Sequence, residues 1–161
     1  MSTLTLKSRI IHLHWLRLAL VALTLAGIGV SAYLMWGYTV PGATLSCGAS
    51  SGCEAVKNSE YARLAGIPLP VLGLGVYLAL LVLLLVQGYA VLRHKNGYIA
   101  LAIFGISLAG VLYSAYLTYL ELFVIYAICR WCVASAVIMV AIFLLSIFNL
   151  RNTESYYSTE G

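Results

Sequence analysis

Four long apolar runs, separated by polar segments, dominate the pattern along this chain. They cover residues 18–36, 70–92, 97–120 and 131–150, and none of them contains a charged residue. Their lengths suit the roughly 20 helical residues that cross the apolar core of a bilayer. Polar and apolar residues do not alternate within them, which favours helices over the strands of a membrane barrel. The pattern predicts an all-α integral membrane protein, a bundle of four transmembrane helices that forms a single domain over residues 1–150.

The polar segments differ in length and character. Residues 37–69 form a long loop, and its first half is rich in Gly and Ser, which is typical of irregular chain. Residues 54–64 mix apolar side chains such as Val56 with charged ones, and this weak amphipathic pattern predicts a short helix on the membrane surface. Residues 151–161 form a polar tail, of which residues 152–161 are expected to be disordered.

The composition agrees with a membrane protein and excludes an ordinary soluble domain, since 63% of the residues are hydrophobic and 9% are charged. The net charge of +4 does not indicate nucleic-acid binding. The basic residues flank the apolar runs and form no cluster interleaved with aromatic residues. No nucleic-acid partner is therefore expected.

The distribution of basic residues predicts the orientation of the bundle in the lipid bilayer. Six of the nine Lys and Arg residues flank one end of the predicted helices, namely Lys7, Arg9, Arg17, Arg93, Lys95 and Arg151. The other end carries Lys57, Arg63 and Arg130. Because Lys and Arg favour cytoplasmic loops, both termini are expected in the cytoplasm and all four cysteines on the external face of the inner (cytoplasmic) membrane. Disulfides persist in such a compartment, whereas the cytosol keeps thiols reduced.

The cysteines form two pairs on that external side. Cys129 and Cys132 begin the last predicted helix, where free N–H groups and the helix dipole stabilise a thiolate, and Arg130 adds positive charge between them. Cys47 and Cys53 enclose a short flexible stretch, so they are able to pair and to reach a sulfur on another element. Together the pairs favour a relay that carries electrons from external thiols to an acceptor at membrane depth. A quinone is the acceptor that suits apolar walls.

Two other uses of the cysteines stay open at this point. Both pairs could be static disulfides that staple the loop of a non-enzymatic membrane scaffold. A tetrahedral zinc site could instead use all four thiolates, but it leaves no role for the amphipathic segment, so no metal is expected. A Cys–His catalytic pair is excluded, because the three histidines all lie on the predicted cytoplasmic side: His12, His14 and His94.

One carboxylate stands close to the second cysteine pair in the sequence. Glu121 follows the third apolar run, about two helical turns before Cys129. It could accept a proton, since quinone reduction consumes protons and thiol oxidation releases them. The plainer interpretation is favoured here, namely that Glu121 lies at the outer interface in contact with water.

Four motifs in this order carry a resemblance to a known family. They are Cys47-x5-Cys53, Ser59 six residues later, Gly66-Ile-Pro-Leu-Pro-Val-Leu-Gly73, and Ile128-Cys-Arg-Trp-Cys132. On a chain with four predicted helices, they resemble the vitamin K epoxide reductase family, specifically its bacterial-type members without a fused thioredoxin-like domain. The resemblance covers nearly the whole chain.

The resemblance implies a role for each site residue. Cys132 would face the quinone and form the adduct with it, Cys129 would exchange with Cys53, and Cys47 would meet the partner protein. Ser59 would lie on the short surface helix that caps the quinone pocket. The residues expected to contact the quinone are Cys132, Ser59, Val56, Ala136 and Leu69.

Two positions depart from the animal members of that family. The animal enzymes carry a Tyr where this chain has Ala136, and an Asn where the alignment gives Leu69. Both polar groups contact the vitamin K head in those enzymes, so their absence favours a plain quinone as oxidant. Reduction of vitamin K epoxide stays as an alternative activity.

The resemblance therefore implies a quinone-dependent thiol oxidoreductase that promotes disulfide bond formation. The quinone would be ubiquinone or menaquinone. The chain continues for eleven residues after the fourth run. A separate exported partner is therefore expected, thioredoxin-like or DsbA-like.

Overall fold

Four long helices make up most of the protein. The computed structural model describes residues 3–40, 43, 45, 52–64, 66–90 and 96–157. The helices are α1 (Thr3–Thr39), α3 (Leu69–Ala90), α4 (Asn96–Leu120) and α5 (Arg130–Tyr157). Four segments are long and apolar enough to cross a membrane, namely His14–Thr39, Leu69–Gly88, Tyr98–Ile125 and Arg130–Arg151. The predicted all-α, four-helix membrane bundle is confirmed.

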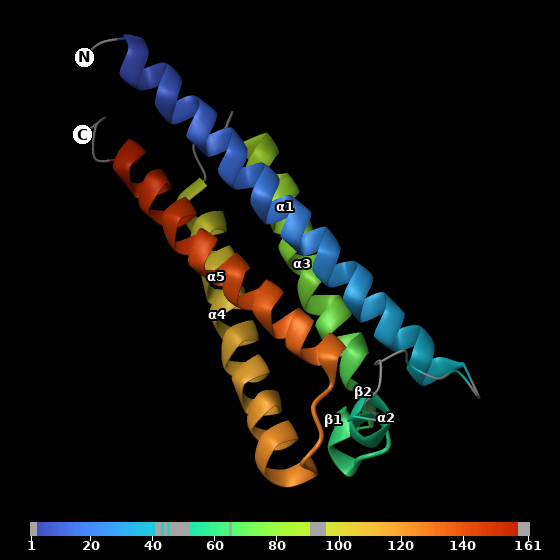
Figure 1. Cartoon of the computed structure of the whole chain (residues 1–161). Coiled ribbons are helices and arrows are strands. Elements are labelled where there is room, and N and C mark those ends of the chain that lie inside the picture. The colour runs from blue at the N-terminus through green and yellow to red at the C-terminus, as the bar shows by residue number, and fades with distance from the viewer. Residues whose placement is uncertain are drawn as a thin grey trace.

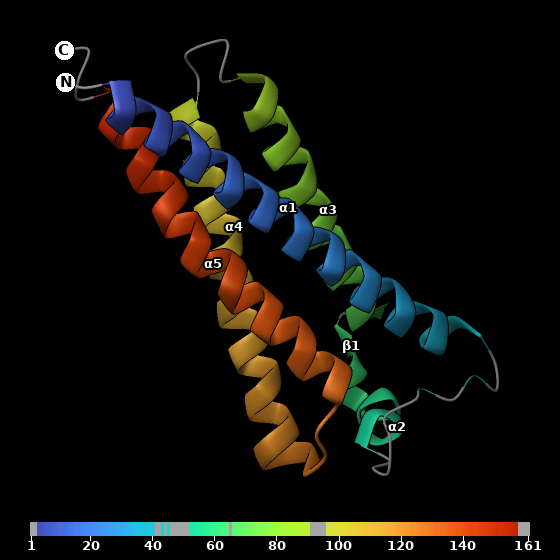
Figure 2. The same cartoon turned by 45° about the horizontal axis from the view of Figure 1, so that its top comes forward.

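The helices alternate in direction and enclose a common interior (Figures 1 and 2). Both α1 and α4 pack against α3 and α5, so that the four helices form a closed ring. The first turn of α1 and the last turn of α5 lie at one end of the bundle (Figure 1). The small elements α2, β1 and β2 lie at the other end, beside the start of α5. This end is called the loop end below.

Two helices extend further than the apolar runs. α1 begins at Thr3, before the first run, and α5 continues to Tyr157. The expectation of disorder is therefore wrong for residues 152–157. These residues contain neither Gly nor Pro, so nothing in their backbone chemistry ends the helix where the apolar run ends.

The long loop contains more than the single short helix predicted for residues 54–64. α2 (Gly52–Lys57) is followed by the 3-10 turn η1 (Glu60–Ala62) and by two short antiparallel strands, β1 (Arg63–Leu64) and β2 (Ile67–Pro68). Gly66 has a φ of +84° in the connection between the strands, a backbone region that glycine enters without steric cost. The prediction of a helix is correct for the first part of the segment and wrong for the rest.

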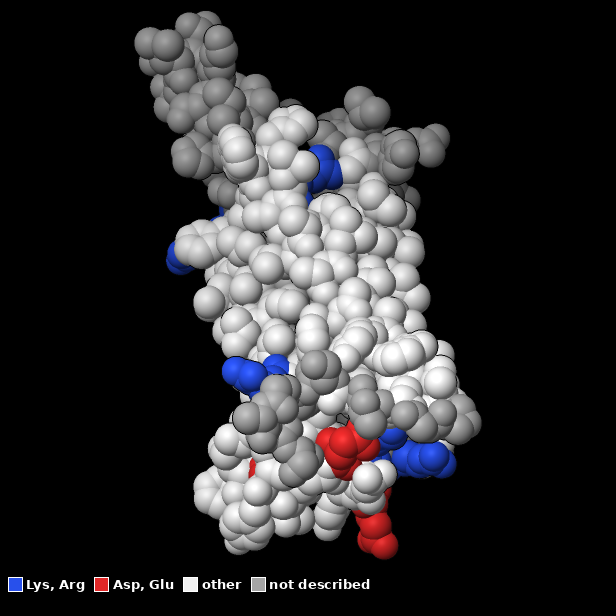
Figure 3. Space-filling model, turned by 45° about the vertical axis from the view of Figure 1, so that its right-hand side comes forward, with Lys and Arg blue, Asp and Glu red and all other residues white. Residues whose placement is uncertain are grey.

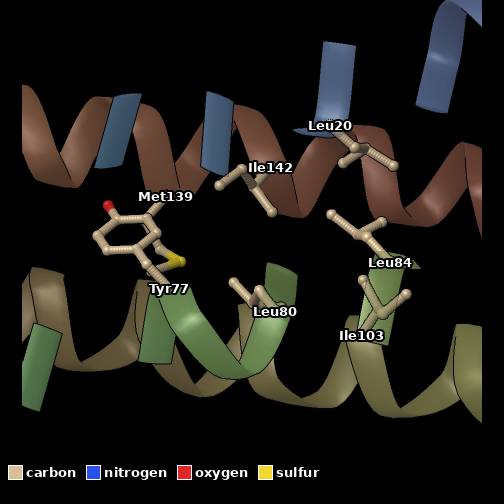
Figure 4. Close-up of a cluster of buried hydrophobic side chains, with 7 residues drawn as sticks. All are labelled: Leu20, Tyr77, Leu80, Leu84, Ile103, Met139 and Ile142. Atoms are coloured by element: carbon tan, nitrogen blue, oxygen red, sulfur yellow. The ribbon is translucent and has the colours of Figure 1, made fainter. Parts of the chain in front are cut away.

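The core is built from apolar side chains of all four long helices (Figure 4). It consists of Leu20, Tyr77, Leu80, Leu84, Ile103, Met139 and Ile142. Gly27 makes room for the largest of these, because a Cβ there would lie 2.2 Å from the ring of Tyr77. The Tyr77 hydroxyl donates a hydrogen bond to the carbonyl of Ser135, 3.0 Å away, which joins α3 to α5. The core therefore fixes how the four helices pack against one another next to the loop end.

Charged side chains avoid the middle of the molecule on the face shown in Figure 3. The acidic residues coloured in this view lie at the loop end, and basic residues lie on either side of a broad uncharged surface. A surface of this kind is suited to lipid tails in the middle and to water at the two ends.

Candidate functional site

Two cysteines from distant parts of the chain lie in one buried cluster at the loop end. Cys53 belongs to α2, and Cys129 directly precedes α5. Each has only 1% of its surface exposed. The cluster is completed by Leu34, Leu45 and Val56. The fold thus brings together the two cysteine motifs, which are 76 residues apart in sequence.

A glycine allows this close approach. A Cβ added to Gly52 would lie 2.2 Å from the carbonyl oxygen of Ile128, the residue before Cys129. Because that neighbour is backbone and not the end of a flexible side chain, no side chain fits at position 52 without displacing α2. The first turn of α2 therefore packs directly on the chain that leads into Cys129.

Polar contacts attach the preceding loop to α2. The Leu45 N–H donates to Glu54 Oε1 at 3.1 Å, and Lys57 Nζ donates to the carbonyl of Ala43 at 3.2 Å. Lys57 and Glu54 also form an ion pair of 3.8 Å. The contacts anchor two points of the loop that precede Cys47, which itself lies outside the described residues.

The two cysteine motifs are in different redox states in this structure. Cys53 is disulfide-bonded, whereas Cys129 and Cys132 are free thiols. The scaffold alternative, in which both motifs are static disulfides, stays open. A sulfur held in a disulfide is not available as a thiolate ligand, which removes Cys53 from a four-cysteine zinc site in this state.

Cys129 caps α5 with its own sulfur. The first helical residue is Arg130, and the N–H of Cys132, the third helical residue, donates to Cys129 Sγ at 3.3 Å. The Cys129 carbonyl accepts the N–H of Val133 at 3.0 Å, as the first bond of the helix. This is the geometry of an N-cap residue, with a sulfur in the place of the usual oxygen. The predicted role of the helix start in binding the thiolate is thus visible as a hydrogen bond.

These contacts change the acidity of Cys129. Hydrogen bonds from the Cys132 thiol and backbone N–H, opposed by burial, hold the pKa of the Cys129 thiol below its usual range. The side chain of Arg130 is exposed. The lowered pKa is therefore explained by hydrogen bonds at the helix start without the charge of Arg130.

Cys132 faces a cavity of about 140 Å³ between the helices. This volume is roughly ten times the space that one buried water needs. All four long helices and α2 contribute to its walls, and Tyr77 and Met139 of the core also line it. Cys129 is not among the lining residues. Cys132 also packs against the cluster that contains Cys53 and Cys129, so it lies between that cluster and the cavity, whereas Cys129 is buried within the cluster.

The five residues expected to contact a quinone all line this cavity. They are Val56, Ser59, Leu69, Cys132 and Ala136. The position of Ser59 differs in detail from the expectation, because Ser59 is not on a helix. It lies in extended conformation between α2 and η1, and its hydroxyl donates to the carbonyl of Val56 at 2.7 Å. The polar pair Asn58-Ser59 interrupts the predicted surface helix at this point.

The structure corrects the interpretation of Glu121. This side chain is 5% exposed and lines the cavity, and is not in contact with water at the outer interface. Its Oε2 accepts the N–H of Cys129 at 3.1 Å, and Cys132 lies on the same cavity wall. In the sequence, the only sign that Glu121 lies beside the cysteine pair is that it is a single carboxylate among apolar residues shortly before Cys129.

Two tyrosines of the cavity wall were also missed by sequence reasoning. Tyr38 follows the end of the first apolar run, a position typical of an aromatic belt at the membrane interface, and Tyr113 lies within the third run, yet both line the cavity. A tyrosine on a membrane helix gives the same sequence pattern whether its hydroxyl reaches an interface or an internal cavity. Only the packing of the helices distinguishes the two cases.

The sequence was compared with models of known protein families. The model described as "Vitamin K epoxide reductase family" matches residues 18–147, a range that overlaps all four membrane-spanning segments and contains all four cysteines. The match agrees with the four-helix bundle and with the cysteine pair at the start of α5. The chain belongs to the vitamin K epoxide reductase family and is, at that level, a membrane oxidoreductase of thiols and disulfides.

Proposed function

We propose that this protein is a quinone-dependent thiol oxidase of the inner (cytoplasmic) membrane. In this proposal it reoxidises a separate exported protein, thioredoxin-like or DsbA-like, and passes the electrons to ubiquinone or menaquinone. The observation that carries the proposal is that one of the two free thiols lines the cavity and the other does not. Both thiols pack with the cluster that contains Cys53, Cys129 as a buried member and Cys132 at its edge, but only Cys132 also lines the cavity.

The cavity has the composition that a quinone head requires. Most of its wall is apolar, including Val56, Leu69 and Ala136, and would pack on the faces of a flat ring. Tyr38 also lies on the wall, and its hydroxyl could donate a hydrogen bond to a ring oxygen, whereas the hydroxyl of Ser59 already donates to the carbonyl of Val56. When bound, a quinone supplies an acceptor for two electrons and two protons.

The other cysteines would carry electrons to this pair by thiol–disulfide exchange. A dithiol of the partner protein reduces the disulfide of Cys53, for which we propose Cys47 as the second cysteine. Cys53 then attacks Cys129 of an oxidised Cys129–Cys132 pair and releases Cys132 as a thiol. Cys47 resolves the mixed disulfide between Cys53 and Cys129. A sulfur with a lowered pKa is a better leaving group, so the N-cap contacts of Cys129 favour this last step.

The proposal predicts a clear loss in one variant. Purified protein in a membrane mimetic, supplied with a reduced thioredoxin-like protein and a soluble quinone, should reduce the quinone, as followed by absorbance. Cys132→Ser should abolish this turnover, whereas Tyr98→Phe, an exposed residue at the far end of α4, should leave it unchanged. Full activity of Cys132→Ser would contradict the relay. Absence of turnover in the wild type would support a scaffold.

Vitamin K epoxide serves as the contrasting substrate in the same assay. Leu69 and Ala136 line the cavity at the positions where the animal enzymes carry Asn and Tyr. We therefore expect slow turnover of the epoxide with a dithiol as reductant. A rate comparable with that on quinone would show that epoxide reduction belongs to this enzyme.

A further inference from the structure

Glu121 occupies an unusual position for a carboxylate. It lies within the candidate membrane span Tyr98–Ile125, at the start of the π-helical turn η2 (Glu121–Ile125). Ionisable side chains in membrane-spanning segments are costly and commonly serve a function. In the described part of the chain, the ion pair that is present joins Lys57 and Glu54, and no Lys or Arg pairs with Glu121. An ion pair with Lys or Arg therefore does not explain why the Glu121 carboxylate is buried.

The contacts of Glu121 point to the cysteine pair. One carboxylate oxygen accepts the N–H of Cys129 at 3.1 Å, and the carboxylate shares the wall of the cavity with Cys132. Glu121 also lines the cavity, together with Cys132 and Tyr38. A single carboxylate thus binds the backbone of the cysteine motif and lines the cavity that Cys132 faces.

We propose that Glu121 is a catalytic residue that takes the proton from the Cys132 thiol and delivers it to an oxygen of the quinone. The inference rests on the proposed function, because the second half of the transfer needs a quinone in the cavity. Proton transfer by a positioned side chain requires the side chain to stand near the proton that moves. Glu121 lines the cavity together with Cys132, and the N–H of Cys129 holds its carboxylate at the start of the cysteine motif.

The protons and electrons of the reaction balance with this assignment. Oxidation of the two thiols to a disulfide releases two electrons and two protons, and reduction of a quinone to a hydroquinone takes up the same number. The S–H bond of Cys132 breaks and an O–H bond forms on Glu121, which then passes its proton to one quinone oxygen. Cys129 reacts as the thiolate, having lost its proton to water, and the second quinone oxygen takes its proton from water. The S–S bond between Cys129 and Cys132 forms as the electron pair leaves.

A purely structural role for Glu121 is the main alternative, since its side chain also holds the N–H of Cys129. Glu121→Gln separates the two roles. The amide oxygen of Gln still accepts a backbone N–H, but it does not accept a proton from a thiol at neutral pH. Glu121→Asp keeps an acid on a shorter side chain, and Glu60→Gln is a matched control on an exposed residue of η1.

The first measurement is the rate at which fully reduced protein reduces a quinone in a single turnover. We expect Glu121→Gln to slow this step by about 100-fold or more, the usual contribution of general acid–base catalysis. Glu121→Asp should retain part of the rate, and Glu60→Gln all of it. Exchange of Cys129 with a small disulfide should be unchanged in all three variants.

Three outcomes would overturn the inference. One is a wild-type rate of quinone reduction in Glu121→Gln. Another is an equal loss of thiol exchange and quinone reduction with a lower unfolding temperature, which would make Glu121 a structural residue. A wild-type protein that exchanges thiols but does not reduce quinone would refute the proposed function, and this inference with it.

The second measurement needs no quinone. In a Cys129→Ser background, alkylation of Cys132 by N-ethylmaleimide is followed by mass spectrometry. If Glu121 accepts the thiol proton, Glu121→Gln should slow the alkylation. If Glu121 acts only through its negative charge, removing that charge should make Cys132 ionise more readily and react faster. Faster or unchanged alkylation would therefore overturn the inference.

Discussion

Cys129 binds the first turn of α5 through its sulfur, so a single atom is both helix cap and redox group. The hydrogen bonds from the thiol and the N–H of Cys132 exist only in the folded chain. They stabilise the thiolate more than the thiol, which is why the pKa of Cys129 falls below its usual range. The resulting contribution to stability is present above the pKa of the unfolded thiol and is lost as the pH falls through the lower pKa of the folded one.

This shift predicts the pH dependence of alkylation. In the reduced protein, Cys129 should remain reactive at pH values below about 8.5, the ordinary pKa of a cysteine. Cys132→Ala removes the thiol donor but keeps the backbone N–H, so the midpoint for Cys129 should move to higher pH. The measurement is the alkylation rate of Cys129 as a function of pH. An unchanged midpoint in Cys132→Ala would show that the thiol of Cys132 does not stabilise the thiolate.

Gly52 is the second residue on which the relay depends. Gly52→Ala places a methyl group against the backbone of Ile128, so α2 and Cys53 must move away from Cys129. We expect exchange between Cys53 and Cys129 to slow by about 10- to 100-fold, since small misplacements of reacting groups have effects of this size. Single-turnover thiol trapping measures this exchange.

Gly75→Ala is the matched control for Gly52→Ala, because no atom lies within 4 Å of a Cβ at that position. It should exchange at the wild-type rate. Quinone reduction by the already reduced Cys129–Cys132 pair should be unaffected by either substitution. A wild-type exchange rate in Gly52→Ala would mean that the close approach of α2 is not required.

At the scale of elements, the end of α4 determines where Glu121 and Cys129 meet. The helix widens into η2 and stops at Tyr126, which has a φ of 53° in the left-handed region. The N–H groups of Tyr126 and Ala127 both bond to the carbonyl of Glu121, the latter at 3.1 Å. This C-terminal cap reverses the chain within a few residues and directs it back to α5.

The left-handed conformation of Tyr126 predicts that two substitutions at this position differ in their free energy of unfolding. Asn enters this region at low cost, whereas a β-branched residue is strained there. Tyr126→Val should therefore lower the free energy of unfolding by about 1–2 kcal/mol relative to Tyr126→Asn. Thermal unfolding in detergent compares the two. Because the side chain is 83% exposed, lost packing is a minor contribution, and equal stabilities would contradict the strain argument.

At the scale of the whole molecule, the alternation of the helices determines which groups share a side of the membrane. The start of α1 and the end of α5 lie at one end of the bundle, and the cysteine cluster lies at the other (Figure 1). Only an external position of the cluster suits the proposed exchange with an exported protein. The excess of Lys and Arg at the end that carries the termini agrees with that orientation.

This orientation is tested with reporters fused to the C-terminus of the full chain. A fluorescent protein that folds only in the cytoplasm should be bright, and alkaline phosphatase, which needs an exported compartment, should be inactive. The positive-inside rule is the physical reason for the expectation. A second pair of fusions after residue 95 should behave in the same way. Active phosphatase in either position would reverse the proposed orientation and place the cysteines in the cytoplasm.

The sequence by itself determined the class of fold, because apolar runs of membrane-crossing length have few alternatives to helices. It also predicted thiol–disulfide chemistry, because a cysteine pair at a helix start favours a reactive thiolate, and the family match confirms this class of activity. The extent of α5 was not predicted, because hydropathy marks the lipid boundary and not the end of the hydrogen-bonded helix.

Only the tertiary structure decided which residues surround the sulfurs. Glu121 and Tyr38 look like interface residues in the sequence, and the packing of the helices turns both into the cavity. The meeting of Cys53 with Cys129 depends on the contact of Gly52 with Ile128, which joins segments far apart along the chain. Local patterns encode helices and reactive motifs, whereas burial and proximity depend on how whole helices pack, and no short stretch of sequence contains that information.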